Sequence, residues 1–483
     1  VSSLGMSQFS YGGKDRTCLG SMQNVSIIAV NSVVTTVGSS SVSTVGASVF
    51  SHSSDSNSGA FLSLRLVVLA SVSSHLHSKG ESAVASLGSA LYSYSDRSSS
   101  SQIMDHVTIF AKESNVTAEG ISYAISSGGS ALLSGRSGRS DGDNVVMVAV
   151  ASRVMATGST AVAALGTALS NDFCGNSVIV GVNHTVAAYD SLIAAHGTAA
   201  VACIGSVIYD ACTQNKPGSN LTLRGAFFLA SDGTRVTISV PIGANGGMAA
   251  IGATLMSRQA RSQVACADVT LTCQNRATVN VSCGGATMCV ALSVAINIPI
   301  AADCERCWFV TRNHASLSVV GQKTDALRAL GTFFVPANTL KGSRNVAVTL
   351  CGSSFVAPGG VIGPDAATNG TTLTIIGANV SGGATCFTSP PVGSSTTTIL
   401  FTAFDGCQAL GWPLPHIGAM AIAALNTTVI NLTVDGRQTD PTFDRAPFWA
   451  PNEASNGRAA IAFEANDGSA TNAVCLPSSQ AMP

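Results

Sequence analysis

The chain has 483 residues, a net charge of −1 at pH 7 and only 10% charged residues, whereas an average globular protein has about 25%. This balance argues against a nucleic-acid partner, which requires a clear basic excess. The mean hydropathy is +0.36, but no run reaches the roughly 18 apolar residues of a membrane-spanning helix. The longest candidate, residues 290–302, is broken by Ser293, Asn297 and Pro299. We therefore predict no transmembrane segment and attribute the hydropathy to stacked strands or lateral association.

One short phrase recurs along the chain: an aliphatic residue, Gly, a small residue, any residue and another apolar one. Consecutive copies lie roughly 37 to 47 residues apart, which is the range of solenoids and other arrays. Two of the copies, 128–132 and 288–292, are looser than the rest. The copies are residues 45–49, 87–91, 128–132, 165–169, 204–208, 251–255, 288–292, 330–334, 376–380 and 417–421.

In chain order, each unit opens with an apolar segment that predicts a β-strand. A short polar turn follows, such as Asn31-Ser32, Glu113-Ser114, Asn183-His184, Ser231-Asp232 or Asn313-His314. A second strand, the glycine phrase and a polar loop complete the unit, so we expect three strands per unit. The opening strands are predicted at residues 25–30, 62–69, 107–111, 145–150, 178–182, 221–229, 269–273, 308–311, 346–350 and 398–404.

These units predict an all-β fold, a right-handed parallel β-helix of about ten coils over residues 24–435. Alternation would place Val, Ile, Leu and Ala inward and Ser or Thr outward. Residues 1–23 and 436–483 are predicted to be irregular, with a possible last strand at 460–463. The alternatives are a β-sandwich array or a propeller, but the Asn-Gly and Asp-Gly hairpin signals of antiparallel strands are sparse.

Two features predict a secreted or cell-surface chain. The first is a set of N-x-Ser/Thr sequons, expected to carry covalent glycans: Asn24, Asn115, Asn183, Asn220, Asn280, Asn369, Asn379, Asn426 and Asn431. Asn379 lies within a glycine phrase, where we expect the poorest access. The second is a set of cysteines, which fits disulfides in an oxidising compartment: Cys18, Cys174, Cys203, Cys212, Cys266, Cys273, Cys283, Cys289, Cys304, Cys307, Cys351, Cys386, Cys407 and Cys475. Because the chain begins with Val1, we expect a processed chain or a piece of a longer one.

Few residues suggest chemistry. The segment 141–144 (Asp-Gly-Asp-Asn) resembles part of a Ca²⁺ loop but lacks the terminal glutamate, so we interpret it as a solvated turn. His75 and His77 would share one strand face without an evident third metal ligand. Cys304 and Cys307 form a C-x-x-C without a thioredoxin-like context, which favours structural disulfides over redox or zinc chemistry. No nucleophile motif is present, so we predict no catalytic residues, no metal, no cofactor and no enzyme activity.

The Val-rich openings, outward serines, glycine phrase and sequons of residues 25–435 resemble the large dispersed-gene-family surface proteins of trypanosomes and their free-living kinetoplastid relatives. The resemblance implies a pectin-lyase-like β-helix on a eukaryotic microbial surface, with a structural or adhesive role. It rests on no catalytic motif and transfers no functional residues.

The sequence thus predicts a structural extracellular glycoprotein, a β-helical rod that assembles end to end into a surface coat or fibre. Its partners would be further copies of itself and its glycans, because exposed terminal strands are templates for pairing with another chain. An adhesin that binds ligand through its side loops is the alternative. A carbohydrate-active β-helix enzyme is a third possibility.

Overall fold

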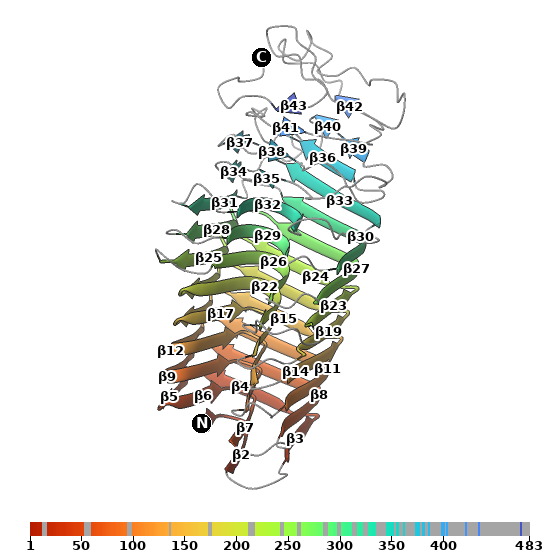
Figure 1. The fold of residues 1–483 in the computed structure, drawn as a ribbon. Coiled ribbons are helices and arrows are strands. Elements are labelled where there is room, and N and C mark those ends of the chain that lie inside the picture. Colours follow the sequence, from red (N-terminus) through yellow and green to blue (C-terminus); the bar gives the residue numbers. More distant parts are fainter. Residues whose placement is uncertain are drawn as a thin grey trace.

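A computed structural model of the chain consists of β-strands, and no helix occurs among its described residues (Figure 1). The structure describes residues 1–282 apart from 12–16, 53–58, 94–98, 135–136, 172–175, 211–217, 242–245 and 258–261. From residue 283 onward the description is confined to the strands and their pairing. The prediction of an all-β chain is therefore confirmed for the part that the structure describes.

The strands of successive repeat units pair in parallel. Strand β10 (Ser89–Ser93), for example, pairs with β7 (Ala47–His52) on one side and β13 (Ser130–Ser134) on the other, which places Leu91 between Val49 and Leu132. The first strands of successive units begin at residues 17, 59, 99, 137, 178, 220 and 263, so one unit spans 38 to 43 residues. Parallel pairing between equivalent strands of successive units produces the stack of strands in Figure 1.

Each complete unit supplies five strand positions, which we number 1 to 5 in chain order. Positions 1 and 2 belong to a 15-stranded sheet and positions 3 to 5 to a 26-stranded sheet. Four strands run through positions 1 and 2: β8 (Gly59–Val72), β11 (Ser99–Lys112), β27 (Gln263–Cys273) and β30 (Ala301–Thr311). Position 1 alone is occupied by β3 (Thr17–Gln23), β14 (Ser137–Asp143), β19 (Val178–Val182) and β23 (Asn220–Arg224). Position 2 alone is occupied by β4 (Ser26–Val30), β15 (Val146–Val150), β20 (Thr185–Tyr189), β24 (Phe227–Ser231), β33 (Arg344–Cys351), β36 (Thr372–Ile376) and β39 (Thr398–Leu400).

The larger sheet is built in the same way. Positions 3 and 4 are spanned by β9 (His75–Ser86) and β12 (Asn115–Ser127). Position 3 alone is occupied by β5 (Val33–Val37), β16 (Arg153–Thr157), β21 (Leu192–His196), β25 (Arg235–Val240), β28 (Thr278–Cys283), β31 (Ser316–Gly321), β34 (Ser354–Val356) and β37 (Asn379–Ser381). Position 4 alone is occupied by β1 (Ser2–Ser3), β6 (Ser40–Thr44), β17 (Thr160–Ala164), β35 (Val361–Ile362), β38 (Thr385–Cys386) and β41 (Ala421–Ile422).

Position 5 completes each unit. Positions 4 and 5 are spanned by β22 (Ala199–Asp210), β26 (Gly246–Ser257), β29 (Met288–Ile296) and β32 (Leu327–Phe334). Position 5 alone is occupied by β2 (Met6–Tyr11), β7, β10, β13 and β18 (Thr167–Asn171). Near the C-terminus, β40 (Thr402–Ala403) pairs with β42 (Thr433–Val434), and β43 (Val474–Cys475) pairs antiparallel with β41.

The predicted polar turns are corners at which one residue takes a left-handed backbone conformation. Such a residue turns the chain without a long loop, and Asn, Asp and Gly adopt this conformation most readily. Within the described residues, the predicted turns have positive φ at Asn31 (48°), Glu113 (51°), Asn183 (53°) and Asp232 (54°). The turn predicted at 313–314 lies outside the described residues.

The expectation of three strands per unit is wrong, because five positions are present. Two corners were hidden in some or all units of the sequence. The corner between positions 1 and 2 was predicted at Asn183 but missed at Leu66 and His106, which take the left-handed conformation within the continuous strands β8 and β11. The other is the glycine phrase, whose glycine lies between positions 4 and 5 rather than within a strand in several units, as Gly46 does between β6 and β7.

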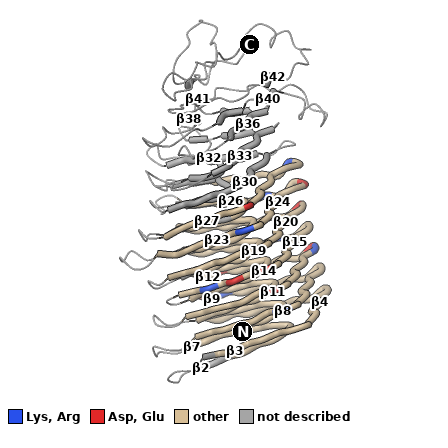
Figure 2. The backbone as a smooth tube through the Cα atoms, turned by 90° about the vertical axis from the view of Figure 1, so that its right-hand side faces the viewer, with Lys and Arg blue, Asp and Glu red and all other residues tan. Residues whose placement is uncertain are grey.

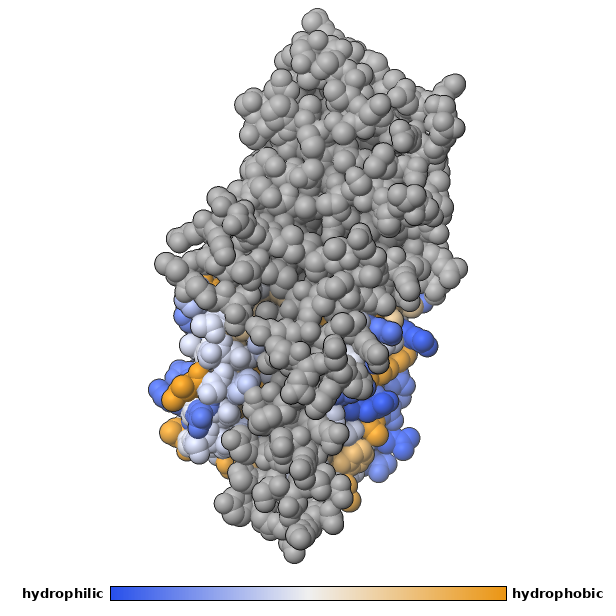
Figure 3. All heavy atoms as spheres, in the orientation of Figure 1, coloured by the Kyte–Doolittle hydropathy of each residue, from blue (hydrophilic) through white to orange (hydrophobic). Residues whose placement is uncertain are grey.

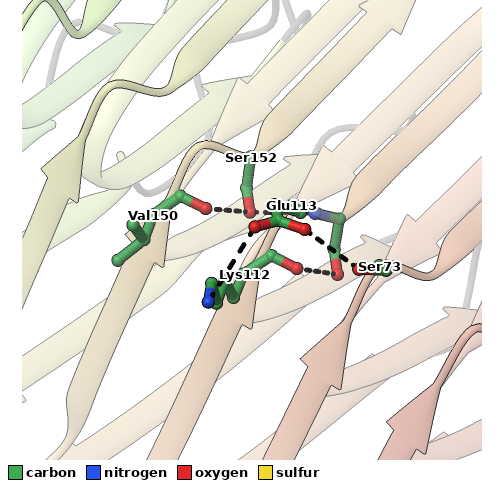
Figure 4. Close-up of polar contacts among 6 residues, drawn as sticks. Ser73, Lys112, Glu113, Val150 and Ser152 are labelled. Atoms are coloured by element: carbon green, nitrogen blue, oxygen red, sulfur yellow. Dashed lines mark hydrogen bonds and ion pairs between the residues drawn. The ribbon is translucent and has the colours of Figure 1, made fainter.

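Serine hydroxyls form a ladder at the corner between positions 2 and 3. The backbone N–H of Ser114 donates to Oγ of Ser152 at 3.1 Å, and the N–H of Ser152 donates to Oγ of Ser191 at 3.1 Å. Each hydroxyl also donates to the carbonyl two residues earlier, as Ser152 does to Val150 at 2.9 Å (Figure 4). The ladder gives hydrogen-bond partners to backbone groups that are buried at this corner.

Side chains from all five positions fill the main core. At positions 1 to 3 buried and outward residues alternate, so the predicted inward placement of apolar residues is confirmed there. The predicted Ser or Thr at outward positions is wrong for β15, whose outward residues are Val146, Val148 and Val150. Positions 4 and 5 are different, because β10 is buried on both faces. Its second face joins a separate apolar cluster in which the rings of Phe50 and Tyr92 stack with centroids 4.8 Å apart.

Residues 1–23 differ from the predicted irregular segment. Strands β1, β2 and β3 pair in parallel with β6, β7 and β8, the equivalent strands one unit further along the chain. Their serines and glycines mask the strand pattern in the sequence, because hydrogen bonds of the backbone, not apolar side chains, carry most of the pairing. The possible strand at 460–463 lies outside the described residues.

Candidate functional site

The histidines proposed as half of a metal site lie on the outer face of β9. His75 is exposed and its Nδ1 lies 2.9 Å from Nδ2 of Asn115 in the next unit. His77 is half-buried on the same face. No group of three or more metal-ligating side chains occurs among the described residues, so these two histidines form a surface pair there.

The acidic segment 141–144 is part of the sheet rather than a free loop. Asp141 lies in β14 and accepts a hydrogen bond from Nε of Arg139 at 2.7 Å. Asn144 takes the left-handed conformation at the corner after this strand. Its Oδ1 accepts a hydrogen bond from Nδ2 of Asn183 at 3.2 Å. The interpretation of 141–144 as a solvated turn is therefore wrong for 141–143, which lie in β14, and only Asn144 stands at a corner. Oδ1 of Asp141 is buried without a hydrogen-bond partner.

Three of the predicted disulfide cysteines, Cys203, Cys266 and Cys273, are buried free thiols. Burial raises the pKa of each to about 12, which keeps them protonated and unreactive at neutral pH. Cys18 is buried and its thiol contacts the carbonyl oxygen of Phe50 at 3.8 Å. The rest of the set, or its side chains, lies outside the described residues: Cys174, Cys212, Cys283, Cys289, Cys304, Cys307, Cys351, Cys386, Cys407 and Cys475.

Backbone register brings one pair of predicted cysteines together. Cys266 of β27 is paired with Cys304 of β30. Neighbouring strands lie about 4.8 Å apart, and disulfides bridge Cα atoms about 4.4 to 6.8 Å apart. Cys266 is a free thiol in the structure, so a bridge from Cys266 to Cys304 stays a prediction, as does the disulfide set as a whole, and this register pair is the place to test it first.

A buried histidine was missed in the sequence. His184 is 2% exposed and occupies the inward position that holds Val in four earlier units. Its ring fills space left by Gly142 and Gly181, because a Cβ on Gly142 would overlap the ring and one on Gly181 would lie 2.9 Å from Nδ1. Burial lowers the pKa of His184 to about 4, and the backbone of Gly142 and the charge of Asp143 offset this only in part. In the sequence, Gly142 and Gly181 were the signal that could have revealed this buried histidine.

The five sequons in the described part of the chain all lie at outward-facing or corner positions. Asn24, Asn183 and Asn280 are exposed, and Asn115 and Asn220 are half-buried. Asn24 and Asn183 stand at left-handed corners, where the side chain projects from the sheet. The other predicted glycosylation sites, or their side chains, lie outside the described residues: Asn369, Asn379, Asn426 and Asn431.

Glycan attachment is testable one sequon at a time. In material from the native cell, we expect an asparagine-to-glutamine change at Asn24, Asn183 or Asn280 to remove one glycan, seen as one step in gel mobility and one lost glycopeptide in mass spectrometry. The physical reason is that these amides are exposed to the transferase. Asn144→Gln, a corner asparagine outside any sequon, serves as the control. Unmodified peptides at all three exposed sites would contradict the prediction.

The N-terminal end of the stack has an unpaired edge. Strand β4 pairs with β8 and β5 pairs with β9, and no further partner of either strand occurs among the described residues. This edge carries large apolar side chains that are widely exposed: Ile28 (65%), Val30 (54%), Val33 (70%) and Val37 (73%). An unpaired strand edge with apolar side chains is a template for another strand.

Gly38 and Gly80 show how this end differs from the interior. The two glycines occupy the same corner in adjacent units. A Cβ built on Gly80 would overlap the carbonyl oxygen of Gly38, whereas a Cβ on Gly38 would meet nothing within 4 Å. In the described part of the chain, the space before Gly38 is therefore open, whereas the corner at Gly80 has a neighbouring unit.

None of the described residues forms a helix that is long and apolar enough to cross a membrane. Comparison with protein-family models, with curated proteins and with solved structures finds no match.

Proposed function

We propose that the chain is a structural extracellular glycoprotein, a right-handed parallel β-helical rod that assembles end to end into a surface coat or fibre. The observation that carries this proposal is the unpaired edge of β4 and β5 with its exposed Ile28, Val30, Val33 and Val37. Soluble proteins normally protect such edges with charges, prolines or bulges. Here apolar side chains stand in their place, which favours addition of another chain.

The rest of the unit supports the same role. The pairing of each strand with its equivalent in the next unit is the pattern expected of a solenoid, in which each unit contacts only its neighbours. A heterologous contact between two ends does not close on itself and generates a filament. Sequons on outward faces would then place glycans along the flanks of the stack.

The test is to charge the edge without disturbing the fold. Val33→Lys and Val37→Lys change side chains that are 70% and 73% exposed, so we expect little effect on stability. Two lysines on an edge strand oppose strand addition, so in sedimentation the double variant should lack the polymers that the unaltered protein forms. Ile121→Lys, which charges a 78% exposed apolar residue within the stack, is the matched control and should polymerise normally.

Polymers of the V33K/V37K variant as long as those of the unaltered protein would contradict the proposal. So would an unaltered protein that sediments as single chains at every concentration tested.

A further inference from the structure

Two rows of residues meet on the inner side of the corner between positions 1 and 2. The first row holds the residue two places before the corner, and the second row holds the residue directly after the corner. Every residue with an apolar side chain in these rows, from β8 to β27, belongs to the main core. The first row reads Leu64, Met104, Gly142, Gly181, Leu223 and Cys266, and the second reads Val67, Val107, Val145, His184, Ala226 and Val269.

Strands β27 and β30, which are neighbours in the stack (Figure 1), bring three cysteines into these rows. Cys266 is the first-row residue of β27 and is 3% exposed. Register pairs Cys304 of β30 with Cys266, and Cys307 with Val269. Cys304 is therefore the next member of the first row, and Cys307 is the next member of the second. The C-x-x-C segment thus spans the corner, with one cysteine in each row.

His184 shows how close these positions lie to one another. It is a second-row residue, whereas Gly181 and Gly142 are the first-row residues of the same unit and of the preceding one. A Cβ on Gly142 would overlap the ring of His184, and a Cβ on Gly181 would lie 2.9 Å from Nδ1 of His184. Within the earlier unit, Cγ2 of Val145 would lie 3.3 Å from a Cβ on Gly142. One second-row side chain therefore reaches the first-row positions of two units.

The three cysteines stand at equivalent positions further along the stack. Cys307 stands where His184 stands in its unit, and Cys304 and Cys266 stand where the two glycines stand. Equivalent residues of neighbouring strands lie about 4.8 Å apart. Three sulfurs bound to one ion at about 2.3 Å lie about 4 Å from one another. The spacing of the positions thus suits one ion bound by all three sulfurs.

We propose that Cys266, Cys304 and Cys307 bind one thiophilic metal cation, Zn²⁺ or Cu⁺, inside the core. Thiolate sulfur is the ligand that these soft ions select in proteins. The disulfide predicted from the sequence is the rival use of the same site. It would join Cys266 to Cys304 and leave the third sulfur unused, whereas an ion uses all three. Because the ligands come from two successive units, the bound ion holds β27 against β30.

Metal binding at this site exchanges protons for the ion. Burial raises the pKa of Cys266 to about 12, so its thiol keeps its proton in the metal-free chain. Each metal–sulfur bond that forms displaces the proton of one thiol into solvent, so three bonds release three protons. No sulfur changes its oxidation state, and binding weakens as the pH is lowered.

The surface of the described stack offers little competition for such an ion. Charged residues are sparse along it (Figure 2), and apolar residues lie beside hydrophilic ones on its flanks (Figure 3). The surface pair of His75 and His77 is the alternative site for either ion. Its imidazoles lack the ultraviolet absorption of a metal thiolate, so the absorption spectrum separates the two sites.

The experiment uses the full chain, kept reduced and freed of metal by a chelator. Zn²⁺ and Cu⁺ are added in separate titrations against a colorimetric chelator of known affinity. We expect one equivalent of one of these ions to bind with metal-thiolate absorption and a dissociation constant below about 1 μM at pH 7. Cys307→Ser should raise this constant about 100-fold or more, because loss of an outer-shell partner alone costs roughly 10- to 100-fold.

Cys273→Ser is the matched control. Cys273 is another buried thiol of β27, but its Sγ lies 3.7 Å from the carbonyl oxygen of Ala277, at the far end of the strand. This variant should change the dissociation constant less than about threefold. Circular dichroism checks that both variants remain folded. Should C307S misfold, C307V supplies the valine that the second row has at Val269 and takes its place.

Binding of neither ion, or equal affinities of C307S and C273S, would overturn the proposal. So would peptide mapping of the native, unreduced chain that finds Cys266 bridged to Cys304. The site lies away from the unpaired edge of β4 and β5 (Figure 1), so its failure would leave the proposed function untouched.

Discussion

Gly80→Ala should destabilise the protein by about 3 kcal/mol or more, whereas Gly38→Ala at the same corner of the preceding unit should leave stability unchanged. The methyl group that replaces a hydrogen of Gly80 would overlap the backbone carbonyl of Gly38 and lie within 3.1 Å of that of Ser39. Backbone oxygens held in the strand pairing have no free direction in which to move. The methyl group added to Gly38 would meet nothing within 4 Å.

Urea denaturation of the two variants beside the unaltered protein measures this difference. It is best done at a dilution where the chain is monomeric, so that contacts between copies do not contribute. A lower midpoint for G80A and an unchanged midpoint for G38A would confirm that the stack of units begins at Gly38. Equal midpoints would show that the units are not stacked in this register.

The second large effect is a loss of stability at acidic pH through His184. Burial lowers its folded pKa to about 4 from the ordinary value of 6.5, so the unfolded chain binds more protons between these values. The contribution of the neutral, buried His184 to the free energy of unfolding is therefore fully present above pH 6.5. It falls as the pH is lowered through this window and is fully lost below about pH 4. The difference in pKa corresponds to roughly 3 kcal/mol.

Comparison with a variant that cannot titrate isolates this residue from the carboxylates. We expect His184→Gln to lose stability at neutral pH but to show a flatter dependence of the unfolding free energy on pH between 6.5 and 4. His196→Gln, which removes an exposed histidine from β21, reports the effect of losing a histidine at the surface. A slope for H184Q as steep as that of the unaltered protein would place His184 outside the core.

The sequence predicted the elements whose cause is local. The polar turns at Asn31 and Glu113 and the strands that precede them follow from turn chemistry and apolar patterning, and the structure has both. The repeat period was also visible in the sequence. The glycine of the repeated phrase faces the backbone of the next unit, so this corner tolerates no side chain. Gly166, whose Cβ would overlap the carbonyl of Gly205, is an example.

Features that depend on neighbouring units were not predictable. The corner at Leu66 has no turn residue, and the register with the next unit holds its backbone in place. Positions 4 and 5 bury both faces, so Phe50 and Tyr92 enter a second cluster that alternation alone places in solvent.

Electron microscopy of native, untreated material tests the central claim most directly. About ten units with a spacing of about 4.8 Å give a rod of roughly 50 Å, and end-to-end assembly predicts regular filaments with an axial repeat near that length. Isolated rods of roughly 50 Å, with no filaments in fresh material, would contradict the account of a coat or fibre assembled through the unpaired edge of β4 and β5.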